Sequence, residues 1–140
     1  MDSIGTCDVL IENATVVSPG EPLLRGASVA ITGERITAVC AGEACARFHA
    51  ARYIDAGGGL CIPGLVNTHN HTPLMAVRGM VEDLGFAPAY TRGVPQGHWL
   101  DDEDTAVLAR LGLAELLCQG CTSVVDFYAR PAPLASAMAE

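Results

Sequence analysis

The first part of the chain consists of short apolar runs of β-forming residues, separated by polar turns. Residues 7–17 are rich in β-forming side chains and predict a strand. Two shorter apolar runs, at 27–31 and 35–39, flank a tight turn and predict a β-hairpin. Residues 41–51 are rich in alanine and predict one poorly defined helical turn, and residues 52–55 predict another short strand. This part of the chain is therefore expected to be mainly β-structure.

Helical periodicity is clear only in the last third of the chain. Asp101 or Asp102 is placed to cap a helix, and the acidic residues that follow complement the helix dipole. Apolar residues then recur on one face as far as Gly120, which is placed to end the helix. Residues 122–127 predict a strand after it, and residues 134–140 predict the start of a further helix.

A short apolar run before this helix ends in two histidines. Residues 61–71, CIPGLVNTHNH, predict a fully buried strand of the kind found in parallel sheets. His69 and His71 would lie on one face of it, because side chains alternate along a strand. Two neutral imidazoles on one face can bind one divalent ion, at a Zn–N distance of about 2.0–2.1 Å. Together with the helix and the strand at 122–127, the run predicts the βαβ order of a parallel sheet.

Composition and charge exclude several classes of protein. The net charge is −8 and all eight basic residues are arginines, so a basic nucleic-acid-binding patch is not expected. No apolar run reaches the roughly 18 residues that a membrane span needs, so no membrane partner is expected. The N-terminus lacks the basic and apolar regions of a secretory signal, which makes the cytoplasm the expected location.

The six cysteines show no framework spacing, so buried or free thiols are expected rather than disulfides. Cys118 and Cys121 match Cys-x-x-Cys, a spacing used in redox and zinc chemistry. A structural zinc site of this type needs a second such pair, and the chain has none. Ordinary packing is the favoured interpretation, and a thiol redox module is kept as an alternative.

Residues 54–71 resemble the opening of the barrel in metal-dependent amidohydrolases. Residues 54–58, IDAGG, and 63–71, PGLVNTHNH, hold the Pro-Gly pair, the asparagine and both histidines in the expected places. Residues 115–122 add a helix that ends in glycine before a threonine-rich strand, so the resemblance covers essentially the whole chain. It is closest to the deaminase and chlorohydrolase branch, which acts on purine-like and triazine-like rings.

The resemblance implies an α/β fold in which a (β/α)8 TIM-type barrel begins after part of a small β-sandwich. Residues 1–58 would be the partial sandwich, and residues 59–140 the first βαβ portion of the barrel. Because such a barrel takes roughly 250 residues, a chain of 140 residues is expected to be truncated and inactive by itself. A homo-oligomer is considered for the full-length protein.

The resemblance also implies a hydrolase that acts on carbon–nitrogen bonds other than peptide bonds. His69 and His71 would bind one divalent ion, zinc in the first place and iron as the alternative. Metal-activated water would attack a small heterocyclic substrate, with deamination as the favoured reaction. The catalytic acid or base would come from later strands, so none is expected within this chain. Asn70 is assigned to packing or support, and Asp126 to a structural or orienting role rather than a catalytic one.

Two alternatives to a deaminase remain open. Within the superfamily, the protein could be a chlorohydrolase or a cyclic amidase, because the motif at the first strand does not separate these reactions. In a different class, the chain could be a non-catalytic remnant or an assembly module. That alternative predicts weak or absent metal binding, because two histidines leave a tetrahedral coordination shell half empty.

Residues 72–99 form a long stretch without clear periodicity, and long loops of this kind are often functional. Its candidates for contact with a substrate are Arg78, Glu82, His98 and Trp99. Solvated loop charges explain Arg78 and Glu82 equally well. For His98 an exposed loop histidine is the favoured interpretation, and for Trp99 simple packing is the alternative.

Overall fold

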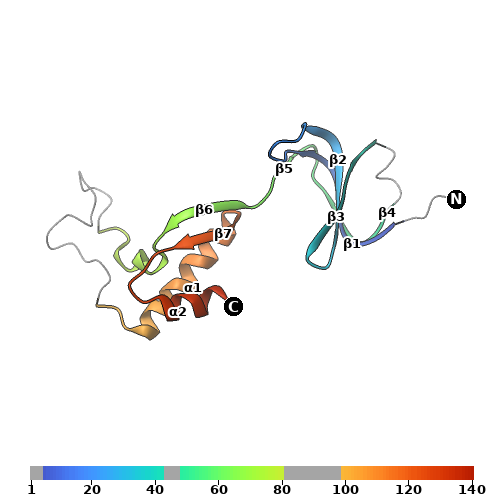
Figure 1. Cartoon of the computed structure of the whole chain (residues 1–140). Coiled ribbons are helices and arrows are strands. Elements are labelled where there is room, and N and C mark those ends of the chain that lie inside the picture. The colour runs from blue at the N-terminus through green and yellow to red at the C-terminus, as the bar shows by residue number, and fades with distance from the viewer. Residues whose placement is uncertain (1–4, 43–47, 81–98) are drawn as a thin grey trace. The chain divides into compact units, whose positions relative to one another are not determined.

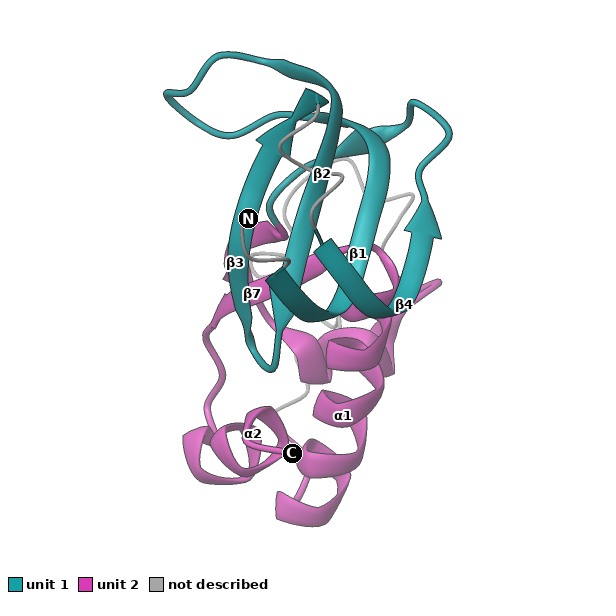
Figure 2. Ribbon diagram, turned by 90° about the vertical axis from the view of Figure 1, so that its right-hand side faces the viewer, with its two compact units in different colours: residues 1–63 teal, residues 64–140 magenta. Residues whose placement is uncertain are grey.

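The computed structural model describes residues 5–42, 48–80 and 99–140. The chain divides into two compact units, Met1–Pro63 and Gly64–Glu140 (Figure 2). Strands occur in both units and α-helices in the second, so the chain is an α/β protein with a mixed sheet. Among the helices of the described ranges, none has the length and apolar character needed to cross a membrane.

The first unit is a five-stranded sheet (Figure 1). Its strands are β1 (Gly5–Val16), β2 (Leu24–Thr32), β3 (Arg35–Ala41), β4 (Phe48–Asp55) and β5 (Leu60–Cys61). Their order is β3-β2-β1-β4, and the short β5 also pairs with β1. The β1–β2 and β2–β3 pairs are antiparallel, whereas β4 and β5 run parallel to β1.

The apolar pattern of the sequence predicted most of these strands. The strand predicted at 7–17 and the hairpin predicted at 27–39 are confirmed as β1 and as the β2–β3 pair. The helical turn predicted for 41–51 is wrong at its C-terminal end, because β4 begins at Phe48 and forms a ladder with β1. The described residues of this unit form one sheet, so its assignment to a partial β-sandwich stays a prediction.

The core of the first unit lies along β1 and β2. Leu10 is opposite Ala30 in the register, and Ala14 is opposite Ala27. Leu10 is only 1% exposed, and the three alanines are fully buried. β1 is therefore the centre of this sheet, with a paired strand on each side.

The expectation of free or buried thiols holds only in part. Cys7, Cys61, Cys118 and Cys121 are free. Cys40 in β3 is disulfide-bonded, which corrects the expectation for that residue. Cysteine spacing could not reveal this, because a disulfide depends on the positions into which the fold brings two Cβ atoms.

The second unit joins two parallel strands through helices. Its elements are β6 (Leu65–Asn70), the 3₁₀-helix η2 (Thr72–Val77), α1 (Asp102–Cys118), β7 (Cys121–Asp126) and α2 (Pro131–Met138). β6 and β7 run side by side in the same direction, which confirms the predicted βαβ order (Figure 1). α1 packs against β7, η2 and α2. The α1–α2 contact buries Ala109, Leu134 and Ala137.

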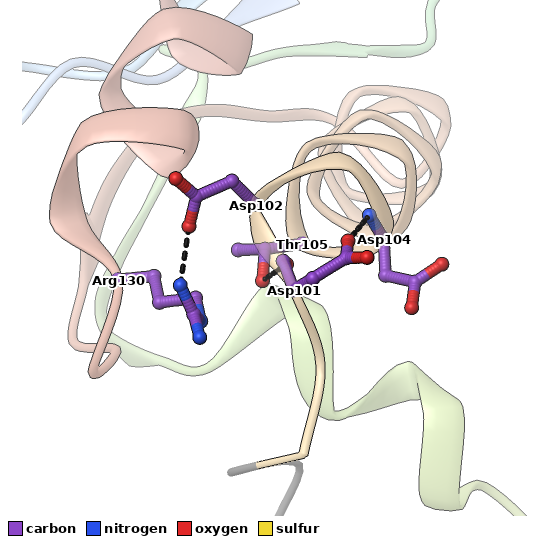
Figure 3. A network of polar contacts seen from close by, with 5 residues as sticks. All are labelled: Asp101, Asp102, Asp104, Thr105 and Arg130. Carbon is purple, nitrogen blue, oxygen red and sulfur yellow. Dashed lines mark hydrogen bonds and ion pairs between the residues drawn. The ribbon is translucent and has the colours of Figure 1, made fainter.

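α1 begins where the sequence predicted. The carboxylate of Asp101 accepts a hydrogen bond of 2.8 Å from the backbone N–H of Asp104 (Figure 3). The hydroxyl of Thr105 donates to the carbonyl of Asp101 at 2.6 Å. Arg130, which precedes α2, forms an ion pair of 2.5 Å with Asp102. The start of α1 is thus fixed both within the helix and to α2.

Two glycines allow β6 and β7 to meet. Gly120 has a φ of 82°, a left-handed conformation that ends the helical segment, and β7 starts at the next residue. Gly64 directly precedes β6, and a Cβ added to it would lie 2.7 Å from Cβ of Thr122. The backbone N–H of Leu65 donates to the carbonyl of Gly120 at 2.8 Å. The glycine of the Pro-Gly pair is therefore needed for close packing.

β6 differs from its prediction in two ways. It ends at Asn70, so His69 lies in the strand whereas His71 follows it and precedes η2, a helix that was not predicted. The strand is also not fully buried, since Leu65 is 52% exposed and Val66 is 63% exposed. Among the described strands β6 pairs only with β7, and apolar composition alone cannot indicate which faces of a strand are covered.

Candidate metal centre

His69 and His71 come together at the end of β6. Their ring centroids are 5.0 Å apart, and the ring planes meet at 83°. A tetrahedral ion with Zn–N bonds of about 2.0–2.1 Å would hold the centroids of two ligand rings roughly 5 Å apart. The spacing of the two rings therefore fits a shared ion, even though only His69 belongs to the strand.

The ring of His71 is oriented by the backbone that follows β7. Its Nδ1 is hydrogen-bonded to the carbonyl oxygen of Phe127. A carbonyl oxygen can only accept, so Nδ1 carries the proton in this hydrogen bond. In the neutral imidazole, Nε2 then keeps its lone pair, which is the form in which histidine binds a metal.

The carboxylate of Asp126 binds the residues on both sides of His71. Its Oδ2 accepts hydrogen bonds from Nδ2 of Asn70 at 3.1 Å, from the backbone N–H of Thr72 at 3.1 Å and from the Thr72 hydroxyl at 2.7 Å. The backbone N–H of Phe127 also donates to the carbonyl of Asn70 at 2.9 Å. These contacts tie the end of β6 to the end of β7 around His71.

The side chain of Phe127 lies beside both histidines. Its ring centroid is 5.6 Å from that of His69 and 6.4 Å from that of His71. The residue is 53% exposed. An open aromatic wall beside two imidazoles can hold a planar ring by stacking or edge contacts.

Two of the four predicted substrate-loop residues lie in the described ranges. Arg78 follows η2 and donates two hydrogen bonds, of 3.0 and 2.7 Å, to the carboxylate of Glu115 on α1. His71 lines the same cavity of about 230 Å³ as this pair. Trp99 is 64% exposed. Outside the described residues lie the other two, Glu82 and His98.

Sequence reasoning did not identify two contributors to this site, Thr72 and Phe127. Thr72 is only 3% exposed, and its hydroxyl is bonded to Asp126. The available signal was the Thr-Pro pair directly after the second histidine, because proline favours the first turn of a helix. Phe127 orients His71 through its backbone carbonyl, a group that every residue has, so no side-chain pattern could indicate it.

The Cys-x-x-Cys pair lies at the junction of α1 and β7. Cys118 is exposed at the end of the helix, and Cys121 is buried at the start of the strand. The thiol of Cys121 donates to the carbonyl of Ser123 at 3.2 Å. These contacts are those of a packed strand residue and offer no support for a redox module.

The described ranges hold no group of three or more His, Cys, Asp and Glu side chains arranged for a metal ion. His69 and His71 therefore offer two ligands. Both supply imidazole nitrogen, a donor that suits zinc and iron. With their spacing and the tautomer of His71, the residues present fit one part of a divalent metal site.

Residues 60–140 match the Amidohydrolase family. A protein named 5-methylthioadenosine/S-adenosylhomocysteine deaminase from Nitratidesulfovibrio vulgaris (strain DSM 19637 / Miyazaki F) is 33% identical over 126 residues, which cover 87% of this chain and 29% of the relative. The protein of the same name from Acetivibrio thermocellus is 32% identical over 137 residues, which cover 95% of this chain and 32% of that relative.

Two solved structures resemble the chain along almost its whole length. An adenosine deaminase from Xanthomonas campestris with bound zinc has a TM-score of 0.77 and 29% identity, over 96% of this chain and 32% of that one. The atrazine chlorohydrolase from Arthrobacter aurescens, complexed with zinc, has a TM-score of 0.73 and 26% identity, over 94% of this chain and 33% of that one.

The chain spans about a third of the length of these proteins. The family match itself covers more than half of the chain and includes both strands and both histidines of the candidate site. The resemblance noted in the sequence is thereby confirmed at the level of the family. The chain belongs to the amidohydrolase family.

Proposed function

We propose that the chain supplies His69 and His71 as ligands to the divalent metal ion of a hydrolase that acts on carbon–nitrogen bonds. The observation that carries the proposal is the pair of rings 5.0 Å apart, with Nδ1 of His71 bonded to a carbonyl so that Nε2 is left for a metal. Zinc is the proposed ion, since it suits imidazole and is bound in both solved structures described above. Iron is the alternative.

The proposed reaction is hydrolytic deamination. A bound divalent ion lowers the pKa of a water molecule, which can then attack an electrophilic carbon near neutral pH. His69 and His71 would hold the ion, and the hydrogen bond to the carbonyl of Phe127 keeps His71 in the tautomer that can bind it. We assign proton transfer to a group outside the described residues, because the carboxylate of Asp126 already accepts hydrogen bonds from Asn70 and Thr72.

Adenine nucleosides are the proposed substrate class. The names of the relatives, which refer to methylthioadenosine, S-adenosylhomocysteine and adenosine, support it. The exposed ring of Phe127 offers a surface against which a flat base can pack. Hydrolytic dechlorination of a triazine is the second candidate, supported by the similarity to atrazine chlorohydrolase.

The second unit is proposed to be the opening of a (β/α)8 barrel. The parallel β6 and β7, with α1 between them in the chain, support this, and His69 and His71 would then lie where barrel enzymes have their active sites. The first unit is proposed to be part of a β-sandwich. A cytoplasmic, homo-oligomeric protein is proposed for the full-length enzyme.

The proposal is tested on the protein at the length at which its native source makes it. We expect bound zinc or iron by elemental analysis, and ammonia release from methylthioadenosine, S-adenosylhomocysteine or adenosine. His69→Ala and His71→Ala should each remove metal and turnover together, because each deletes a ligand. The melting temperature of the metal-free protein should change little, since neither substitution removes a buried apolar side chain.

His49→Ala is the matched control, because His49 is an exposed histidine of β4 in the first unit. It should keep both metal and turnover. Turnover retained in His69→Ala or His71→Ala would overturn the metal assignment. Release of chloride from a chlorotriazine without ammonia release would select the second candidate. Absence of both metal and turnover from the wild-type protein would favour a non-catalytic assembly module.

A further inference from the structure

Two residues at the end of β7 and directly after it hold His71 and both of its neighbours. Asp126 bonds the preceding residue, Asn70, and the following residue, Thr72, whereas Phe127 bonds the His71 ring itself. We refer to Asp126 and Phe127 together as the β7 clasp. The clasp consists of the last residue of β7 and the residue after it, and β7 is parallel to β6, so the clasp forms only when the two strands pair.

The carboxylate is the part of the clasp that determines where the backbone at His71 runs. One oxygen, Oδ2, accepts three short hydrogen bonds. The shortest, at 2.7 Å, comes from the hydroxyl of Thr72. Thr72 is nearly fully buried, so its N–H and its hydroxyl have little access to water as a substitute acceptor. Loss of the carboxylate would leave both donors unsatisfied, and the segment would shift to reach solvent.

A shift of this segment would displace His71. The His71 ring bonds the carbonyl of Phe127, which directly follows β7, and the His71 backbone lies between the two residues that Asp126 holds. We propose that Asp126 is a positioning residue, which acts through Asn70 and Thr72 to keep Nδ1 of His71 on the Phe127 carbonyl and Nε2 available for the metal. The part of this proposal that concerns the metal rests on the function proposed above.

The first test measures Zn²⁺ affinity of the full chain by competition with a chromophoric chelator. Asp126→Ala should weaken Zn²⁺ binding about 10- to 100-fold, the range found when residues that support a metal ligand are removed. Asp126→Asn keeps an oxygen that can accept the same donors, so it should recover much of the affinity. Thr72→Val removes one hydroxyl contact at nearly constant volume and should give a smaller loss in the same direction.

Asp101→Ala is the matched control. Asp101 is also a carboxylate of the second unit that accepts a hydrogen bond from a backbone N–H, but it caps α1 and contacts neither histidine (Figure 3). Its loss should lower the melting temperature and leave the Zn²⁺ affinity unchanged. An affinity that falls equally in Asp101→Ala and Asp126→Ala would mean that general destabilisation explains both, and would overturn the proposal.

The second test needs no metal. Nitrogen-15 NMR of the imidazole rings, at a pH where histidine is neutral, reports which nitrogen of His71 carries the proton. The wild-type chain should show the Nδ1-protonated form, and Asp126→Ala should shift His71 toward the tautomer mixture of free imidazole. His49, which is exposed, serves as the internal reference in the same spectrum.

The Zn²⁺ affinity and the His71 tautomer test different proposals. The affinity tests the metal function, and the tautomer tests the positioning role of Asp126. A wild-type chain that binds no Zn²⁺ but whose His71 changes tautomer in Asp126→Ala would reject the metal function and support the positioning role. A His71 tautomer that is the same in the wild type, Asp126→Ala and Thr72→Val would overturn the positioning role, whatever the Zn²⁺ affinity. If Asp126→Ala does not fold, Thr72→Val and Asp126→Asn decide the question alone.

Discussion

Arg78 holds the carboxylate of Glu115 on α1 through two hydrogen bonds, of 3.0 and 2.7 Å. The hydrogen bond from the guanidinium favours the ionised carboxylate, so the pKa of Glu115 is lowered from its ordinary value. The pKa of Glu140 is lowered in the same way, by its hydrogen bonds to Arg110. Both pairs lie at the surface, where salt screens them and their effect on stability is small.

Arg78→Ala should return the pKa of Glu115 to its ordinary range and leave that of Glu140 unchanged. NMR titration of the two carboxyl groups measures both values. A lowered folded-state pKa adds stability above the pKa of the unfolded chain, and this is lost as the pH falls through the folded-state value. Stability should therefore fall less steeply in that acidic range in Arg78→Ala than in the wild type. A Glu115 pKa that does not move would contradict the ion pair.

At the scale of elements, two kinds of polar contact fix the start of α1. Asp101 satisfies a backbone N–H that the first turn of a helix otherwise leaves unpaired. The ion pair of Asp102 and Arg130 joins α1 to the start of α2, but the two side chains are 71% and 42% exposed, so water competes for both. The cap is therefore expected to contribute more than the ion pair.

Asp101→Ala should lower the free energy of unfolding by about 1 kcal/mol, the usual effect of losing a helix cap. Arg130→Ala should lower it by less than about 1 kcal/mol, as is usual for an exposed ion pair. Urea denaturation followed by circular dichroism measures both. Asp101→Asn keeps a capping side chain and should stay close to the wild type. A larger loss in Arg130→Ala than in Asp101→Ala would contradict this ranking.

For the whole molecule, the paired strands of the second unit expose large apolar side chains. Leu65 and Val66 in β6 are 52% and 63% exposed, and Val125 in β7 and Phe127, directly after it, are 46% and 53% exposed. Apolar residues exposed on adjacent strands usually belong to a surface that another surface covers. Unpaired strand edges favour association in the same way.

The 140-residue chain by itself should therefore associate as its concentration rises and should bind an apolar dye. Sedimentation velocity over a concentration series measures the association. Val66→Lys should shift the equilibrium toward the monomer, because it places a charge in the middle of the exposed apolar residues. A chain that stays monomeric at every concentration and binds no dye would show that these side chains are covered in solution.

Most of the elements follow from residues that are near one another in the chain. The cap at Asp101, the helix end at Gly120 and the strand at 7–17 depend on residues that are near one another in the chain. The pair His69 and His71 was also predicted as a candidate site, because its spacing needs no distant partner. The metal role of that pair stays a prediction.

How the histidines are held depends on contacts with segments far away in the chain. His71 lies beyond the strand that was predicted to carry it, and the atom that orients its ring belongs to Phe127, 56 positions further along the chain. The bonds of Asp126 and the exposure of Leu65 likewise depend on which surfaces meet when β6 and β7 pair. Periodicity and spacing describe neighbours in the chain. Contacts between distant segments exist only once the chain has folded.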